Sequence, residues 1–69
     1  WIMAKIQLNG KKISIKSNFS LEDLLKKYKL FNKKVAIEYN GKIIQKINFK
    51  SKLLKNNDKI EIVHFIGGG

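Results

Sequence analysis

Residues that can do chemistry are scarce in this sequence, and the most distinctive feature is a run of glycine at its C-terminus. The chain has 69 residues, no cysteine and one histidine, His64. The sequence ends in Gly67-Gly68-Gly69, so a main-chain carboxylate follows three positions without side chains. Such a segment is thin and conformationally free, and it can thread into a narrow channel of another protein. We therefore expect the carboxylate of Gly69 to be the functional group; the alternative is a frayed end or a cloning remnant.

Side-chain catalysis has little support. The missing cysteine removes thiolate nucleophiles, disulfides and thiolate metal sites. A catalytic triad needs a nucleophile, a base and an acid that orients the base, and the chain could supply these from Ser14, His64 and Asp58. Nothing in the spacing of these residues indicates a triad. Glu22 and Asp23 are explained by the start of a helix. We predict no catalytic residue and no metal site, and we expect His64 to lie at the surface or in an interface.

Length and charge narrow the function classes. Hydrophobic residues make up 43% of the chain and charged residues 29%, which is enough apolar matter for one core. A chain this short buries only about 60% of its unfolded surface, which argues against an enclosed active site of its own. No stretch is long and apolar enough for a membrane span, and no signal peptide opens the chain. We expect no membrane partner and a location in the cytoplasm, or in the plastid stroma if the gene is plastid-encoded.

The chain is strongly basic, with 15 lysines, no arginine and a formal net charge of +10. This charge suits nucleic acid, anionic lipid or an acidic protein surface. Lysine, isoleucine and asparagine are also the residues that an A/T-rich genome over-uses. A protein that binds phosphate groups typically includes arginine, whose guanidinium can make two parallel hydrogen bonds to one phosphate. Because the lysines occur in every segment, we do not expect nucleic acid to be a partner.

The first half of the chain predicts a hairpin and a helix. Apolar residues alternate over residues 4–8 and 12–16, and Asn9-Gly10 between them is typical of a type I′ turn. Leucines and Tyr28 then recur at helical spacing, which predicts a helix over residues 21–29 with Ser20 as its N-cap.

The second half predicts strands at residues 35–39, 42–45 and 59–65, with Asn40-Gly41 as a second tight turn. The stretch between the last two strands is irregular. It is expected to add four side chains to the core: Ile47, Phe49, Leu53 and Leu54.

The element order is therefore β-β-α-β-β-β. One helix packed on one mixed sheet is an α+β architecture, and the ubiquitin-like β-grasp is the common small fold with this order. We expect one domain over residues 3–66 and a flexible glycine tail over residues 67–69. Residues 1–2 precede the first methionine, Met3, and are interpreted as non-native or as a truncated extension.

Several motifs resemble the ThiS family, the sulfur carrier proteins of thiamine biosynthesis. Residues 60–69 are similar to the family's C-terminal signature of a hydrophobic strand, a histidine and a diglycine. Further similar segments lie at residues 8–10, 20–25, 35–41 and 43–44. Lys46 stands where arginine is common, and Asn57 stands where the last turn usually has glycine. Because asparagine tolerates left-handed backbone angles, we expect that turn to form.

The resemblance implies chemistry on the main chain. In this family an E1-like adenylating enzyme uses MgATP to convert the terminal carboxylate, here that of Gly69, to an acyl-adenylate. Sulfur from a cysteine desulfurase route displaces AMP and leaves a thiocarboxylate, which gives its sulfur to thiazole synthase. The resemblance therefore implies a protein co-substrate without a bound cofactor of its own.

The last strand also predicts a docking surface. Val63 and Phe65 lie on the strand face opposite the core residues Ile60 and Ile62, with His64 and Ile66 at the edge of that patch. We expect partners to bind there, with Gly67 and Gly68 as the stalk. The alternative is ordinary packing under a loop.

Two other functions stay open from the sequence. The small subunit of molybdopterin synthase has the same fold and tail chemistry, but its usual tail contains proline and this chain has none. A basic β-grasp module that binds RNA needs no free diglycine end.

Overall fold

A computed structural model describes residues 3–64 of the chain. Its elements, in chain order, are β1 (Met3–Leu8), β2 (Lys11–Lys16), α1 (Leu21–Lys27), β3 (Val35–Tyr39), β4 (Lys42–Ile44), the 3-10 helix η1 (Lys46–Asn48) and β5 (Lys59–His64). The predicted order of strands and helix is confirmed; η1 was not predicted. Neither described helix is long and apolar enough to cross a membrane.

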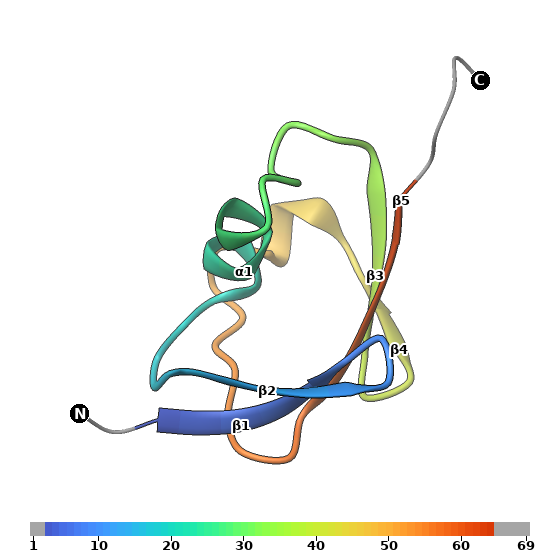
Figure 1. Ribbon diagram of the computed structural model, residues 1–69. Helices are drawn as coiled ribbons and strands as arrows, with labels where there is room; N and C mark the ends of the chain where they lie inside the picture. The colour runs from blue at the N-terminus through green and yellow to red at the C-terminus, as the bar shows by residue number, and fades with distance from the viewer. Residues whose placement is uncertain (1–2, 65–69) are drawn as a thin grey trace.

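The strands form one mixed sheet in the order β2-β1-β5-β3-β4. The last strand, β5, lies in the middle, parallel to β1 and antiparallel to β3. Figure 1 shows α1 and η1 on the same side of this sheet. The core lies between the sheet and these helices, and its buried side chains are Ala4, Ile6, Ile15, Leu21, Leu24, Leu25, Ile37, Tyr39, Phe49, Leu54 and Ile60. The chain is thus a two-layer α+β structure, as predicted.

Two tight turns set the register of the outer strands. Asn9 and Gly10 have φ values of 49° and 84°, and Asn40 and Gly41 have 50° and 86°, which are the positive angles that a type I′ turn needs. A Cβ at either glycine would meet nothing within 4 Å, so glycine is needed there for its backbone angle and not for space. Asn57 also takes a positive φ, 71°, so the last turn forms without glycine, as predicted.

The start of α1 is held by its cap and by the irregular segment that follows η1. Ser20 Oγ accepts from the Asp23 amide at 3.0 Å, and the Asp23 carboxylate accepts from the Ser20 amide at 3.0 Å. The first helical amides, which have no partner inside a helix, donate to the carbonyls of Lys52 and Phe49. The predicted N-cap is therefore confirmed, and the irregular segment is tied to the helix by its backbone.

The helix ends two residues earlier than predicted. Lys29 has a φ of 60°, and the Lys29 and Leu30 amides donate to the carbonyls of Lys26 and Leu25, which is the Schellman pattern of a helix end. Tyr28 is therefore the C-cap and not a core residue, and it is 41% exposed. The helical spacing of apolar residues in the sequence extends to Tyr28, but the backbone leaves the helical conformation after Lys27.

Two of the four residues expected in the core from the irregular segment lie outside it. Phe49 and Leu54 are buried, but Ile47 and Leu53 are 86% and 52% exposed. Leu53 forms a bridge with Ser20 in an extended segment, where consecutive side chains point to opposite sides. Only Leu54 can then reach the core, and Ile47 lies on the outer side of η1.

Candidate functional site

The predicted site lies at the end of β5, and the sheet holds this strand on both sides. Five residue pairs join β5 to β3, from Tyr39–Ile60 to Val35–His64, whereas β1 pairs with only the first two residues of β5. Beyond β1, the side chain of Asn9 takes over: its Oδ1 accepts from the Ile62 amide at 2.8 Å, and its Nδ2 donates to the Ile62 carbonyl at 3.3 Å. Figure 1 shows β5 running to the edge of the domain, where the described chain stops.

The clamp by Asn9 is a second role that the sequence did not reveal. The Asn-Gly pair predicted the turn, and the turn geometry explains the residue without a further contact. Because the clamp joins residues more than fifty positions apart, no local pattern signals it. It holds β5 at Ile62, two residues before the last described residue of the strand.

The alternation predicted for β5 is present. Ile60 is buried and Ile62 is half-buried against the core, while Glu61 and Val63 point to the other side. Val63 is 56% exposed, and His64 is exposed, as predicted. The predicted site residues Phe65, Ile66, Gly67, Gly68 and Gly69 lie outside the described residues.

Val63 belongs to a larger surface, which we call the open-face patch. Residues paired across strands lie on the same face of a sheet, and residues two apart in one strand share that face. The pairs Ala36–Val63, Glu38–Glu61 and Glu38–Ile43 therefore define the patch, which is made of Ala36, Glu38, Ile43, Glu61 and Val63. Ile43 is exposed like Val63, and sequence reasoning missed it because β4 is only three residues long.

Two like charges face each other in the open-face patch. Glu38 and Glu61 are direct cross-strand partners, an arrangement that costs stability when no cation lies between the carboxylates. Together they are two of the five acidic residues of a chain with a net charge of +10. Lys59, two residues before Glu61 in β5, lies on the same face and lines the same hollow as both carboxylates. The patch therefore combines exposed apolar side chains with two carboxylates and one neighbouring ammonium group.

Asp58 is the most buried charged residue described and has a structural role. It is 2% exposed, and its carboxylate accepts hydrogen bonds from Tyr39 Oη at 2.6 Å, Asn40 Nδ2 at 3.1 Å, the Lys55 amide at 2.9 Å and Lys55 Nζ at 3.1 Å. These bonds tie the turn before β5 to the end of β3.

Burial and the hydrogen bonds in this cluster shift the pKa values of Asp58, Tyr39 and Lys55. Burial alone would raise the pKa of Asp58, but the hydrogen bonds from Tyr39, Lys55 and Asn40 outweigh it and lower the pKa below the ordinary aspartate value. Burial, and then the hydrogen bond to Asp58, raise the pKa of Tyr39. The hydrogen bonds to Tyr39 and Asp58 raise the pKa of Lys55.

The structure does not bring Ser14, His64 and Asp58 together. Asp58 immediately precedes β5 and His64 is its last residue, which puts them about 20 Å apart at the usual rise of a strand. Ser14 is on β2, separated from β5 by β1. Within residues 3–64 no three histidine, aspartate or glutamate side chains gather in a way that would bind a metal ion.

Comparisons with known proteins agree on one family. A sequence model of the ThiS family matches residues 4–69. The chain is 46% identical over 65 residues to the sulfur carrier protein ThiS of Bacillus subtilis (strain 168), covering 93% of this chain and 98% of that protein. It is 38% identical to a thiazole synthase of Magnetococcus marinus, but it spans only 20% of that longer protein.

A solved structure has the same fold. The crystal structure of the thiamine biosynthesis protein ThiS from Geobacter metallireducens superposes with a TM-score of 0.78 at 26% sequence identity, covering 94% of this chain and 99% of that one. This match confirms the predicted ubiquitin-like β-grasp fold.

Proposed function

The chain belongs to the ThiS family of sulfur carriers of thiamine biosynthesis, and we propose that the carboxylate of Gly69 is the group that carries the sulfur. The observation that supports this most is the extent of the family match, which runs to residue 69 and so includes the whole glycine run. The described residues supply no competing centre, because Asp58 is committed to four hydrogen bonds and lies far from His64.

The proposed chemistry follows from the poor electrophilicity of a carboxylate. A carboxylate oxygen of Gly69 attacks the α-phosphorus of ATP, pyrophosphate leaves, and the C-terminus becomes an acyl-adenylate. A sulfur nucleophile then adds to the activated carbonyl carbon and AMP leaves, which makes a thiocarboxylate. An E1-like adenylating enzyme would bind MgATP and catalyse both steps, with sulfur derived from a cysteine desulfurase.

Thiazole synthase is the proposed acceptor of the sulfur. A segment similar to almost all of this chain occurs within a longer protein that is named thiazole synthase. Two partners on one polypeptide meet at a high effective concentration, so such a joined chain suits two proteins that must exchange a group. When the C–S bond breaks and the sulfur passes to the acceptor, an oxygen atom from water or from the acceptor's carbonyl would bond to the same carbon and restore the Gly69 carboxylate.

The open-face patch is the proposed docking surface for these enzymes. Val63 and Ile43 offer exposed apolar area. The patch lies on β3, β4 and β5, and β5 is the strand that leads to the tail. Phe65 and Ile66 would extend the contact, with Gly67 and Gly68 as the stalk. His64 pairs with Val35 on the helix side of the sheet, so it does not belong to the open-face patch. A partner that covers this patch would then hold the C-terminus at a fixed distance from its own active site.

Intact-mass analysis tests the proposal. The protein is incubated with an E1-like adenylating enzyme, MgATP and a sulfur donor, and the expected gain is the mass of sulfur minus that of oxygen, localised to Gly69. A chain without Gly68 and Gly69 is the control and should gain nothing. The proposal is wrong if the full chain gains nothing while the Bacillus subtilis ThiS gains sulfur under the same conditions.

A second measurement separates this function from the two other candidates. On addition of thiazole synthase and its small-molecule substrates, the thiocarboxylate should return to the carboxylate mass, which a molybdopterin synthase subunit would not do. An RNA-binding module would keep its RNA affinity after removal of Gly68 and Gly69, whereas a carrier would lose its activity.

A further inference from the structure

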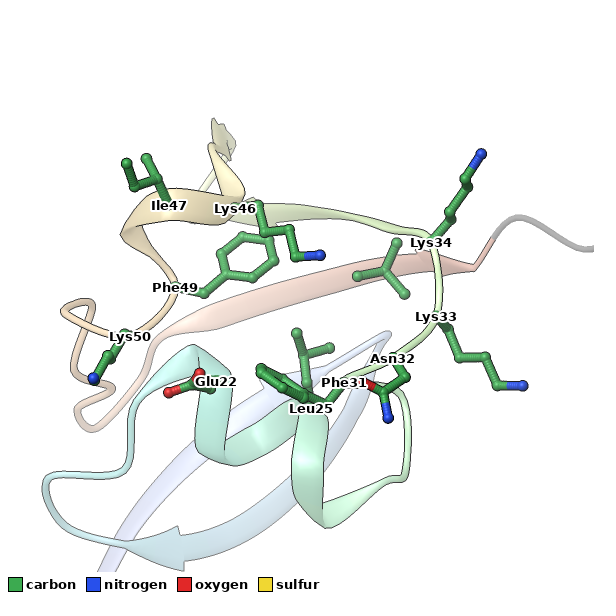
Figure 2. A pocket seen from close by; sticks show the side chains of 11 residues that line it. Glu22, Leu25, Phe31, Asn32, Lys33, Lys34, Lys46, Ile47, Phe49 and Lys50 are labelled. Carbon is green, nitrogen blue, oxygen red and sulfur yellow. The ribbon is translucent and has the colours of Figure 1, made fainter.

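A cavity on the helix side of the sheet is not used by the proposed chemistry. It has a volume of about 540 Å³, which is within the range of ordinary binding sites. Figure 2 shows it between α1, the loop that precedes β3, and the segment around η1. We call it the lysine groove.

The walls of the lysine groove are apolar. Leu25 of α1 and Phe49 line its interior, and Phe31 and Val35 are only half-buried along it. Ile47 stands at its rim and is 86% exposed. Because burial of an isoleucine side chain is favourable, the rim offers apolar area that the folded chain itself leaves exposed.

The rim of the groove is strongly positive. Lys33, Lys34, Lys46 and Lys50 line it, against a single carboxylate, that of Glu22. The one salt bridge found among residues 3–64 joins Lys55 to Asp58, so none of the four rim lysines has its charge neutralised in that part of the chain. Figure 2 shows their ammonium groups on different sides of the groove.

The groove also lies beside the start of the proposed carrier tail. Val35 is the cross-strand partner of His64, the last described residue of β5. Lys34 precedes Val35, and Figure 2 shows it near the end of β5. A molecule in the groove would therefore be close to the point from which the tail leaves the domain, yet on the sheet side opposite to the open-face patch.

We propose that the lysine groove is a second docking site, which binds an acidic protein segment carrying a large apolar side chain. The apolar side chain would enter between Phe31, Val35 and Phe49, and flanking carboxylates would meet the four rim lysines. Charge complementarity selects this occupant, because the groove is positive, apolar inside and concave. Binding there does not require Gly69, so this inference goes beyond the proposed function.

Nucleic acid fits the groove less well. Base recognition by single-strand binders uses open aromatic faces. Phe49 is buried, and the Phe31 ring already has the ammonium of Lys26 at 4.9 Å from its centroid. The aliphatic rim at Ile47 offers no stacking surface.

Titration of the isotope-labelled full chain with a synthetic peptide tests this inference. The probe is a polyglutamate peptide with a central Leu-Phe pair. Its binding is followed at low salt through the chemical shifts of the protein's backbone amides. We expect shifts confined to residues 31–35 and 46–50 and to the facing part of α1. A peptide with Ser-Ser at its centre should bind more weakly, because it lacks the apolar contact.

Two charge-matched double variants locate the site. Lys34→Glu with Lys46→Glu should weaken binding by about ten-fold, since two attractions become repulsions. Lys11→Glu with Lys12→Glu changes the net charge equally but lies on β2, away from the groove, and should retain the affinity. Equal losses in both variants, shifts spread over β2, or no shifts at all would overturn the inference.

An oligouridine RNA is titrated in parallel. If it causes the same shifts at lower concentration than the peptide, the groove is a nucleic-acid site and the inference is wrong. The mass gain at Gly69 is measured on the same double variants in the absence of peptide. For the unmodified chain, a gain of sulfur without peptide binding refutes the groove alone, and peptide binding without a gain of sulfur refutes the carrier function alone.

Discussion

The open-face patch and the lysine groove lie on opposite sides of the same sheet and differ in shape and charge. The patch is part of a strand surface, with exposed Ile43 and Val63 beside two facing carboxylates. The groove is concave, apolar inside and rimmed by four lysines. Strand β3 separates them: Val35 lines the groove, and Ala36, the next residue, belongs to the patch because successive side chains of a strand point to opposite faces.

This difference shows how little a net charge says about a partner. The chain carries +10 overall, yet a partner that docks on β3 and β5 meets two carboxylates, Glu38 and Glu61, beside a single lysine, Lys59. The lysines elsewhere on the surface would favour a different partner, or a different part of the same one. Electrostatic recognition depends on where the charges lie, because salt screens charges that are more than about 10 Å apart.

The largest effect is expected from Asp58, which supports the strands on which both surfaces are built. Asp58→Asn removes a buried carboxylate that accepts four hydrogen bonds. We expect the free energy of unfolding to fall by about 2–3 kcal/mol, measured by urea denaturation. Glu61→Gln, which removes an exposed carboxylate, is the control and should cause no such loss.

The same residue predicts an acid limit to stability. The pKa of Asp58 is lowered in the folded chain, so the folded state favours the carboxylate and the unfolded state binds the proton more readily. Its contribution is complete above the unfolded pKa, near 4, and is lost as the pH falls through the lower folded pKa. Asp58→Asn should lack this step, and an identical acid transition in both proteins would contradict the role given to Asp58.

The next largest effect is expected on the open-face patch. Val63→Asp places a charge on exposed apolar area and should lower kcat/KM for adenylation of the chain by about ten-fold, measured by pyrophosphate release. Leu53→Asp is the matched control, because Leu53 is about as exposed but belongs to neither surface. Both variants should unfold at nearly the same urea concentration as the unmodified chain. Equal losses of activity would mean that the patch is not the docking surface.

The elements were predictable from the sequence, and the two surfaces only in part. Asn-Gly turns, strand alternation and the Ser20 cap are local signals, and each was confirmed. The side of β5 that carries Val63 followed from alternation alone. Ile43 and Glu38 joined it only through pairing between strands, and the groove forms from three segments that no local pattern brings together. The same holds for Asp58, whose partner Tyr39 lies 19 residues away.

The helix end and Ile47 show the opposite failure, in which a local pattern was followed too far. Tyr28 had the spacing of a core residue, but the left-handed Lys29 turned the chain before that spacing could matter. Ile47 was assigned to the core because it is apolar. The structure leaves it on the rim of the groove, where its exposure is one of the observations on which the second docking site depends.

The smallest effect compares the two surfaces by charge alone. Glu61→Gln removes the repulsion with Glu38 and should raise the free energy of unfolding by about 0.2–1 kcal/mol, while lowering the association rate with the adenylating enzyme at low salt. Lys46→Gln, on the groove rim, should leave that rate unchanged although it also removes one charge. Stopped-flow association over a range of ionic strength measures both. If the two variants shift the rate in opposite directions by equal amounts, net charge and not position governs encounter, and the distinction between the surfaces fails for this enzyme.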